Sequence, residues 1–119
     1  MKFMTMVKTT AGSVKSAPPP ALMEGIMKLG MEAGAAGVLV EQGGLMPIAA
    51  GGFVTVVGGE VRITDGPMAE ARELVGGYAV YQVSSKAEVL EWARRFAELH
   101  RQFWPGWEGE IEIRQLMEY

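Results

Sequence analysis

The stretch that decides the fold is residues 78–100, which read YAVYQVSSKAEVLEWARRFAELH. Its first six residues are aromatic or β-branched at most positions, which is typical of a β-strand. Ser85 is followed three residues later by Glu88, and this capping-box spacing predicts that a helix begins there and runs to about His100. A strand leading directly into a helix indicates mixed α and β structure. The helix positions expected to carry its apolar face are Ala87, Val89, Leu90, Ala93, Phe96, Ala97 and His100.

The sequence on either side of this stretch predicts the remaining strands and helices. They are a central strand at 2–8, an amphipathic helix at 21–33, a buried strand at 38–40, a hairpin of strands 53–57 and 61–64, and a half-buried last strand around 111–113. The Gly58-Gly59 pair suits a primed hairpin turn, which places Val56 opposite Val61 and Val54 opposite Ile63. Helices on one face of a mostly antiparallel sheet, in this order, predict a ferredoxin-like α+β domain with an inserted β-hairpin.

Length and composition narrow the class of protein. A chain of 119 residues is the size of one domain, so we expect residues 1–119 to fold as a single unit. The net charge of −3 lacks the positive field that draws proteins to nucleic acid or anionic lipid, and no segment has the apolar length of a signal peptide or a membrane span. With no cysteine and one histidine, we expect no metal site and a cytoplasmic location.

One segment carries a family signature. Residues 61–78 read VRITDGPMAEARELVGGY, which resembles the DGPF branch of the YCII-related family, with Met68 where a Phe is typical. Further similarity lies in MKFM at 1–4, GGLMP at 43–47, EWA at 91–93 and EIEIR at 110–114. The resemblance implies a homodimeric α+β barrel around a cavity. We expect no cofactor. Members of the wider group look like small enzymes with a His-Asp pair, whereas the first predicted helix here has no histidine.

The charged residues of the signature are the candidate catalytic groups. Asp65, Glu70, Arg72 and Glu73 would form a polar cluster in which Arg72 keeps one carboxylate ionised while burial raises the pKa of another. The alternative is structural, because Asp-Gly-Pro is common turn chemistry and Asp65 can cap a turn.

Two further residues are candidate ligand-binding groups. Tyr78 follows the signature directly, and His100 is the single histidine of the chain. For His100 the alternative is a surface cap at the end of its helix, where the negative end of the helix dipole favours an imidazolium.

Three recurrent residue types have simpler interpretations. The methionines, including the helical stripe Met23, Met27 and Met31, are expected to pack in the interior. The glycine pairs at 43–44, 51–52, 58–59 and 76–77 match no phosphate-binding fingerprint and are expected to form turns and bulges. The aromatic residues Trp92, Phe103, Trp104 and Trp107 fit either local burial or a dimer contact.

Three functions fit these observations. The first is a cofactor-independent enzyme or small-molecule-binding protein whose polar cavity supports proton transfer or elimination. The second is an accessory module acting through protein contact, since DGPF-type domains look like companions of sigma factors. The third is a structural dimer in which the signature fixes only a turn and the subunit interface.

Overall fold

The computed structural model describes residues 1–14, 16–46, 50–65 and 73–118, and for residues 65, 73 and 74 it describes the backbone. The elements follow one another in the predicted order. They are β1 (Lys2–Thr10), α1 (Pro20–Ala35), β2 (Leu39–Gly44), β3 (Gly52–Val57), β4 (Glu60–Asp65), β5 (Glu73–Gln82), α2 (Lys86–Phe103) and β6 (Gly109–Gln115).

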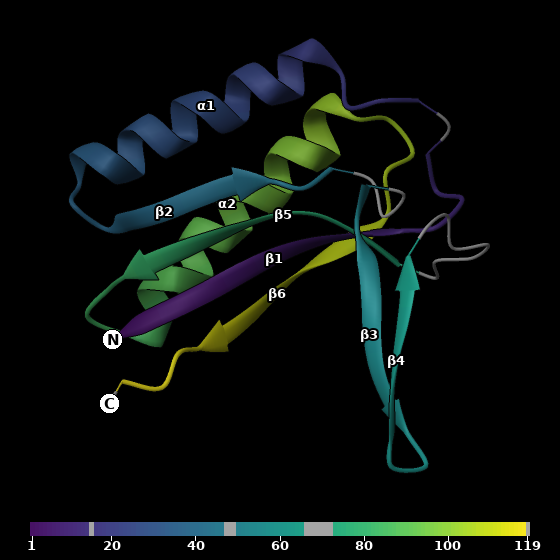
Figure 1. Ribbon diagram of the computed structural model, residues 1–119. Coiled ribbons are helices and arrows are strands. Elements are labelled where there is room, and N and C mark those ends of the chain that lie inside the picture. The colour runs from purple at the N-terminus through teal and green to yellow at the C-terminus, as the bar shows by residue number, and fades with distance from the viewer. Residues whose placement is uncertain (15, 47–49, 66–72, 119) are drawn as a thin grey trace.

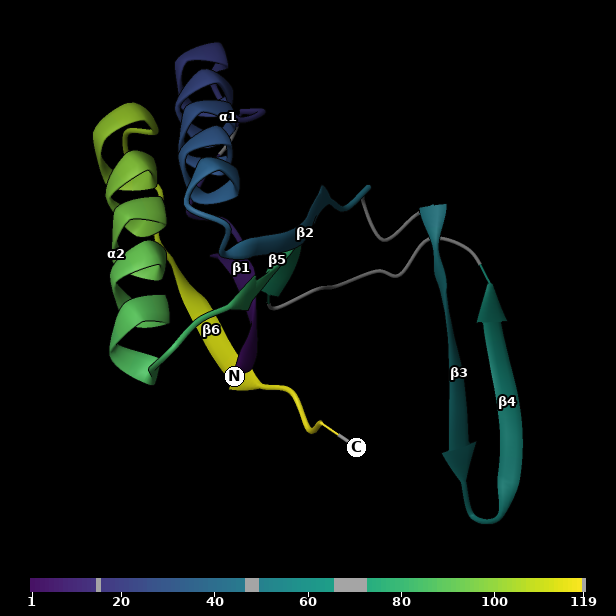
Figure 2. The same cartoon turned by 90° about the vertical axis from the view of Figure 1, so that its left-hand side faces the viewer.

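The main sheet has four strands in the order β2-β5-β1-β6, and each neighbouring pair is antiparallel. Both helices lie on one face of this sheet, as Figures 1 and 2 show, and the other face carries no helix. This arrangement is the predicted ferredoxin-like α+β architecture. The prediction that the first strand is central is confirmed, because β1 pairs with β5 on one side and with β6 on the other.

The core lies between the helices and the sheet. Strand alternation turns Phe3, Thr5, Val7 and Thr9 of β1 toward the helices, and all four are buried. The residues between them face the opposite side of the sheet and are half-buried. Strand β5, the residue that follows it and both helices add further buried apolar side chains, which include Leu22, Leu29, Ala33, Ala79, Tyr81, Val83, Val89 and Ala93.

Helix α2 begins where the sequence predicts. The Ser85 hydroxyl accepts a hydrogen bond from the Glu88 backbone N–H at 3.2 Å, and the Glu88 carboxylate accepts one from the Ser84 N–H at 3.0 Å. The helix continues three residues beyond the predicted end, to Phe103. Two predicted inward positions are wrong: Ala87 and Leu90 are exposed, because the buried side of the helix runs through Val89, Ala93 and His100.

Strands β3 and β4 form a separate two-stranded sheet, which extends away from the rest of the molecule (Figure 2). Gly58 and Gly59 both have positive φ angles at its turn, a conformation that glycine adopts without strain. Val56 lies opposite Val61 and Val54 opposite Ile63, which are the predicted cross-strand pairs. The apolar side chains of these pairs are exposed to between 68% and 76%.

Two burial predictions are wrong. The second strand is not a buried strand: β2 lies at the edge of the sheet, and Val40 is 53% exposed. The methionine stripe of α1 does not pack in the interior either. Met23, Met27 and Met31 are all exposed, because Leu22, Leu29 and Ala33 form the inward side of that helix.

Candidate functional site

A cavity of about 540 Å³ lies between the two helices and one end of the main sheet. Helix α1 contributes Leu22, Met23 and Ile26. The last turns of α2 contribute Phe96 and His100, and Trp104 follows as the C-cap residue of that helix. The sheet supplies the floor. Its lining residues are Val7, Thr9, Gln42, Gly43, Gly44, Leu45, Gly76, Gly77 and Tyr78, with Pro18 at the side.

The floor is hollow because the neighbouring strands β2 and β5 each contain a glycine pair, and these pairs meet in the strand register. Gly44 of β2 lies opposite Gly77 of β5, so neither strand sends a side chain toward the helices there. The backbones also approach closely, since a Cβ atom on Gly77 would lie 3.0 Å from the carbonyl oxygen of Gly43. Gly76 is the extra residue of a β-bulge, because Val7 pairs with Gly77 and Lys8 with Val75.

His100 is the titratable group of this cavity. It is only 4% exposed, which contradicts the surface-cap interpretation. Its Nδ1 lies 3.0 Å from the carbonyl oxygen of Phe96, and because a carbonyl only accepts hydrogen bonds, Nδ1 carries the hydrogen. Burial lowers the pKa of His100, and this effect exceeds the opposing effect of the Phe96 hydrogen bond. The neutral ring therefore has Nε2 as a hydrogen-bond acceptor and a proton acceptor.

Tryptophans surround the imidazole. The ring centroid of His100 lies 4.6 Å from that of Trp107 and 6.3 Å from that of Trp104. The Trp107 indole N–H donates to the Thr9 hydroxyl at 2.9 Å. The Trp104 indole nitrogen is also buried, but it has no hydrogen-bond partner among the described residues. The site thus combines an apolar wall with one acceptor nitrogen, Nε2 of His100.

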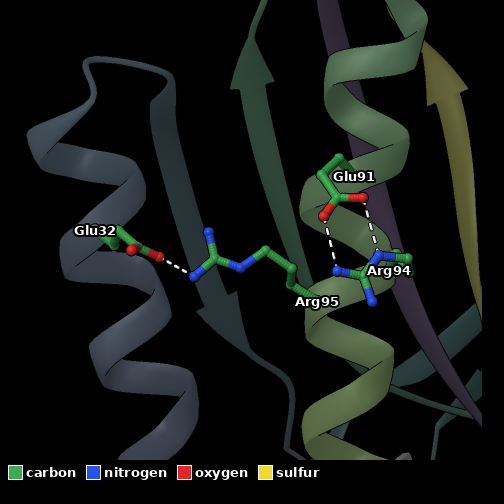
Figure 3. Close-up of polar contacts among 4 residues, drawn as sticks. All are labelled: Glu32, Glu91, Arg94 and Arg95. Atoms are coloured by element: carbon green, nitrogen blue, oxygen red, sulfur yellow. Dashed lines mark hydrogen bonds and ion pairs between the residues drawn. The ribbon is translucent and has the colours of Figure 1, made fainter.

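A second hollow of about 550 Å³ lies between the two helices and differs in character. Its charged residues are paired with one another. Arg95 of α2 forms an ion pair with Glu32 of α1 (Figure 3), and Lys28 pairs with Glu24 within α1. Figure 3 also shows Arg94 bound to Glu91 within α2. By contrast, none of the described residues that line the glycine-floored cavity is charged. We therefore take the glycine-floored cavity as the candidate site, because His100 in its lining forms no ion pair with the described residues.

The structure separates the two predicted ligand-binding residues. His100 lies at the cavity, whereas the ring of Tyr78 lies over Gly43 on the helix-free face of the sheet. The Tyr78 hydroxyl donates a hydrogen bond to the Glu41 carboxylate, and this bond raises the pKa of Tyr78. Tyr78 therefore reaches the cavity through its backbone, at the strand position between Gly77 and Ala79.

The side chains of the predicted catalytic cluster lie outside the described residues. Glu70 and Arg72 lie outside the described residues, as do the side chains of Asp65 and Glu73. The backbone shows where this segment rejoins the sheet: Glu73 pairs with Thr10, next to Thr9 of the cavity. The signature therefore leads into β5 at the end of the sheet where the cavity lies.

Several lining residues were not predicted as site residues. The pairs Gly43-Gly44 and Gly76-Gly77 were assigned to turns and bulges, which is correct for the bulge at Gly76 and wrong for Gly43-Gly44, which lie within β2. The sequence signal for these lining residues was two glycine pairs, each beside an expected strand.

The predicted aromatic cluster does not form one group. Trp104 is buried, whereas Trp92 stacks on Tyr81 at a centroid distance of 6.3 Å.

Comparison with known protein families gives a match over almost the whole chain. Residues 1–117 match the YCII-related domain. No curated protein matches the chain. In the part of the chain that the structure describes, neither helix combines the length and apolarity of a membrane span.

Proposed function

The chain belongs to the YCII-related family, and on that premise we propose that it is a cofactor-independent small-molecule-binding protein of the DGPF branch whose ligand occupies the glycine-floored cavity. One observation carries this proposal: a neutral, buried His100 faces a cavity of about 540 Å³ whose described lining is uncharged. This volume lies within the range of roughly 300–1,000 Å³ typical of ligand pockets. The expected ligand is small and mostly apolar.

Proton transfer is the chemistry that such a site supports. The Nε2 atom of neutral His100 can accept a proton from a molecule bound in the cavity. Asp65, Glu70, Arg72 and Glu73 remain the proposed catalytic partners, because their segment joins β5 next to the cavity. Elimination would use the same base to remove a proton while a leaving group departs.

We also propose that two copies pair through the helix-free faces of their main sheets, as a dimeric α+β barrel. This face carries the half-buried Met4 and Met6 and the side chain of Val80, which lies opposite Met4. Polar pairs surround these apolar residues. Lys8 forms an ion pair with Glu112 at 2.6 Å, and Tyr78 bonds to Glu41. A second sheet would cover the apolar centre of the face.

The cavity proposal is tested by a thermal-shift screen against a metabolite and aromatic-acid library, because a ligand that binds only the folded state raises Tm. The informative variant is Gly44→Ala, which adds a methyl group on the cavity floor without meeting another atom within 4 Å. Gly34→Ala is the matched control, since its Cβ also meets nothing and Gly34 does not line the cavity. We expect ligand shifts to be lost in Gly44→Ala and kept in Gly34→Ala. Shifts kept in both variants would contradict the proposal.

The role of the signature needs a separate variant. If Arg72 holds a ligand or a carboxylate in place, Arg72→Ala removes the shift for the ligands found with the wild-type protein. A wild-type response in Arg72→Ala and Glu70→Gln would leave the cavity proposal standing and exclude the signature from binding.

A second candidate function is protein contact, as an accessory module. The observation in its favour is the exposed apolar face of β3 and β4, formed by Val54, Val56, Val61 and Ile63. An isolated two-stranded sheet is marginally stable in water, so a partner that covers this face would stabilise it. A pull-down from native cells that recovers no stoichiometric partner would count against this function.

A further inference from the structure

The strand register fixes which side chains lie side by side on the helix-free face of the main sheet (Figure 2). Residues that pair in the register form rows across this face. One row contains, from the β2 edge to the β6 edge, Glu41, Val80, Met4 and Arg114. The next row contains Gly43, Tyr78, Met6 and Glu112. In both rows the apolar and aromatic side chains belong to the inner strands, and the charged side chains belong to the edge strands.

The first of these rows is acidic at one edge and basic at the other. Glu41 is exposed and accepts a hydrogen bond from the neutral Tyr78 hydroxyl, and it forms no ion pair among the described residues. The Arg114 side chain is 73% exposed. It lies 3.2 Å from Glu112, a carboxylate that also pairs with Lys8 at 2.6 Å. One copy therefore leaves the carboxylate of Glu41 without a cation and most of the Arg114 guanidinium open to a partner.

We propose that two copies pair through these faces about a two-fold axis parallel to the strands, between β5 and β1, so that Glu41 of each copy forms an ion pair with Arg114 of the partner subunit. This inference rests on the proposed dimer and adds its orientation and its contacts. An axis in this direction keeps the position along the strands and exchanges the two edges of the sheet. Each row therefore faces the same row of the second copy, with β2 over β6 and β5 over β1.

The side chains that meet in this orientation are complementary. In the first row Val80 lies over Met4 of the partner subunit, and the ion pair forms twice because the contact is symmetric. In the second row Tyr78 lies over Met6 of the partner subunit. Packed sheets are rotated by about 30°, which displaces the edge strands by about 4 Å, and the long side chains of glutamate and arginine span this offset.

The other two-fold orientation lacks this complementarity. An axis perpendicular to the strands, in the plane between the sheets, places each strand over its own copy. Glu41 would then face a second β2, which contains no basic residue, and carboxylates opposite each other repel. Arg114 would face a second β6. Glu110, the remaining charged residue of β6 on this face, lies two rows from Arg114 and beside Lys8, so it does not alter the first row.

The test reverses the two charges and measures the dissociation constant of the dimer by analytical ultracentrifugation. We expect Glu41→Arg and Arg114→Glu each to raise the constant at least about tenfold, since each creates two like-charged contacts per dimer. The double variant restores opposite charges and should return to within about threefold of the wild-type constant. Arg94→Glu is the matched control, because Arg94 is an exposed arginine paired with a glutamate of its own element, on a helix. It should keep the wild-type constant.

Each result has a distinct meaning. A wild-type protein that is monomeric at micromolar concentration would overturn both the dimer and its orientation. A dimeric wild-type protein whose constant does not change in either single variant would overturn the orientation alone, and so would a double variant that dimerises no better than the single ones. The ligand proposal is decided separately, by the thermal-shift screen of the cavity.

A second measurement covers the case in which a charge-reversed variant does not fold. The chain contains no cysteine, so Glu41→Cys and Arg114→Cys each introduce a single thiol. A short bis-maleimide should link the two variants to each other after they have exchanged subunits, and it should link neither variant to itself. Links within Glu41→Cys alone would show that β2 lies over β2 and would overturn the proposed axis. The absence of links in the mixture would overturn it as well.

Discussion

At the scale of single residues, the burial of His100 makes stability depend on pH. The pKa of this imidazole is lowered in the folded state by burial, so the unfolded chain binds the proton more readily. The stabilising contribution is therefore present above the unfolded pKa of 6.5 and is lost as the pH falls from there through the folded pKa.

Urea unfolding between pH 7.5 and pH 5 checks this prediction. We expect the free energy of unfolding to decrease across that window in the wild-type protein. Since His100 is the single histidine of the chain, His100→Phe should flatten the same window. Parallel pH profiles for the two proteins would contradict the prediction.

The glycine floor gives a second prediction at this scale. Gly77→Ala places a Cβ atom 3.0 Å from the Gly43 carbonyl oxygen, so the β2 and β5 backbones must separate. Overpacking of this kind costs about 1–3 kcal/mol. Gly44→Ala on the facing strand meets no atom within 4 Å and should change stability by much less. Denaturation midpoints of the two variants measure the difference, and equal losses would contradict it.

At the scale of elements, the N-terminal cap of α2 can be tested directly. Ser85→Ala removes the hydroxyl that accepts the Glu88 N–H, and loss of such a cap costs about 1 kcal/mol. Ser84→Ala is the control, because Ser84 contributes its backbone N–H, which the substitution keeps. We expect chemical denaturation to show the loss in Ser85→Ala alone. A similar loss in both variants would mean that the hydroxyl of Ser85 is not what stabilises this helix end.

At the scale of the whole molecule, the shape and the exposed apolar surface support the proposal that the chain pairs with a partner. The radius of gyration is 16.0 Å, whereas a compact chain of this length has one of about 13.5 Å. The excess follows from the two-stranded sheet, which extends away from the body in Figures 1 and 2. A partner would bury surface that one copy leaves exposed.

The dimer proposal predicts a molecular mass of two chains by light scattering at micromolar concentration. Met6→Lys should shift the protein toward the monomer, because it places a charge on the helix-free sheet face. The new lysine would lie opposite Glu112, so the single copy should tolerate it. Met27→Lys on the exposed side of α1 is the matched control and should remain dimeric. A monomeric wild-type protein would contradict the proposal.

The sequence by itself determined the order of the elements, the start of α2 and the cross-strand pairs of β3 and β4. Each of these depends on residues close together in the chain: Ser85 with Glu88, and the Gly58-Gly59 turn with its flanking valines. It also identified His100 as a candidate, since the chain has no other histidine.

Only the tertiary structure decided which strand lies at the edge and where the cavity forms. Gly44 and Gly77 are 33 positions apart, and they form one floor because β2 and β5 pair in a particular register. His100 likewise joins this site because helix α2 packs over that floor. Strand register and helix packing depend on contacts between distant segments, and local sequence patterns do not contain them.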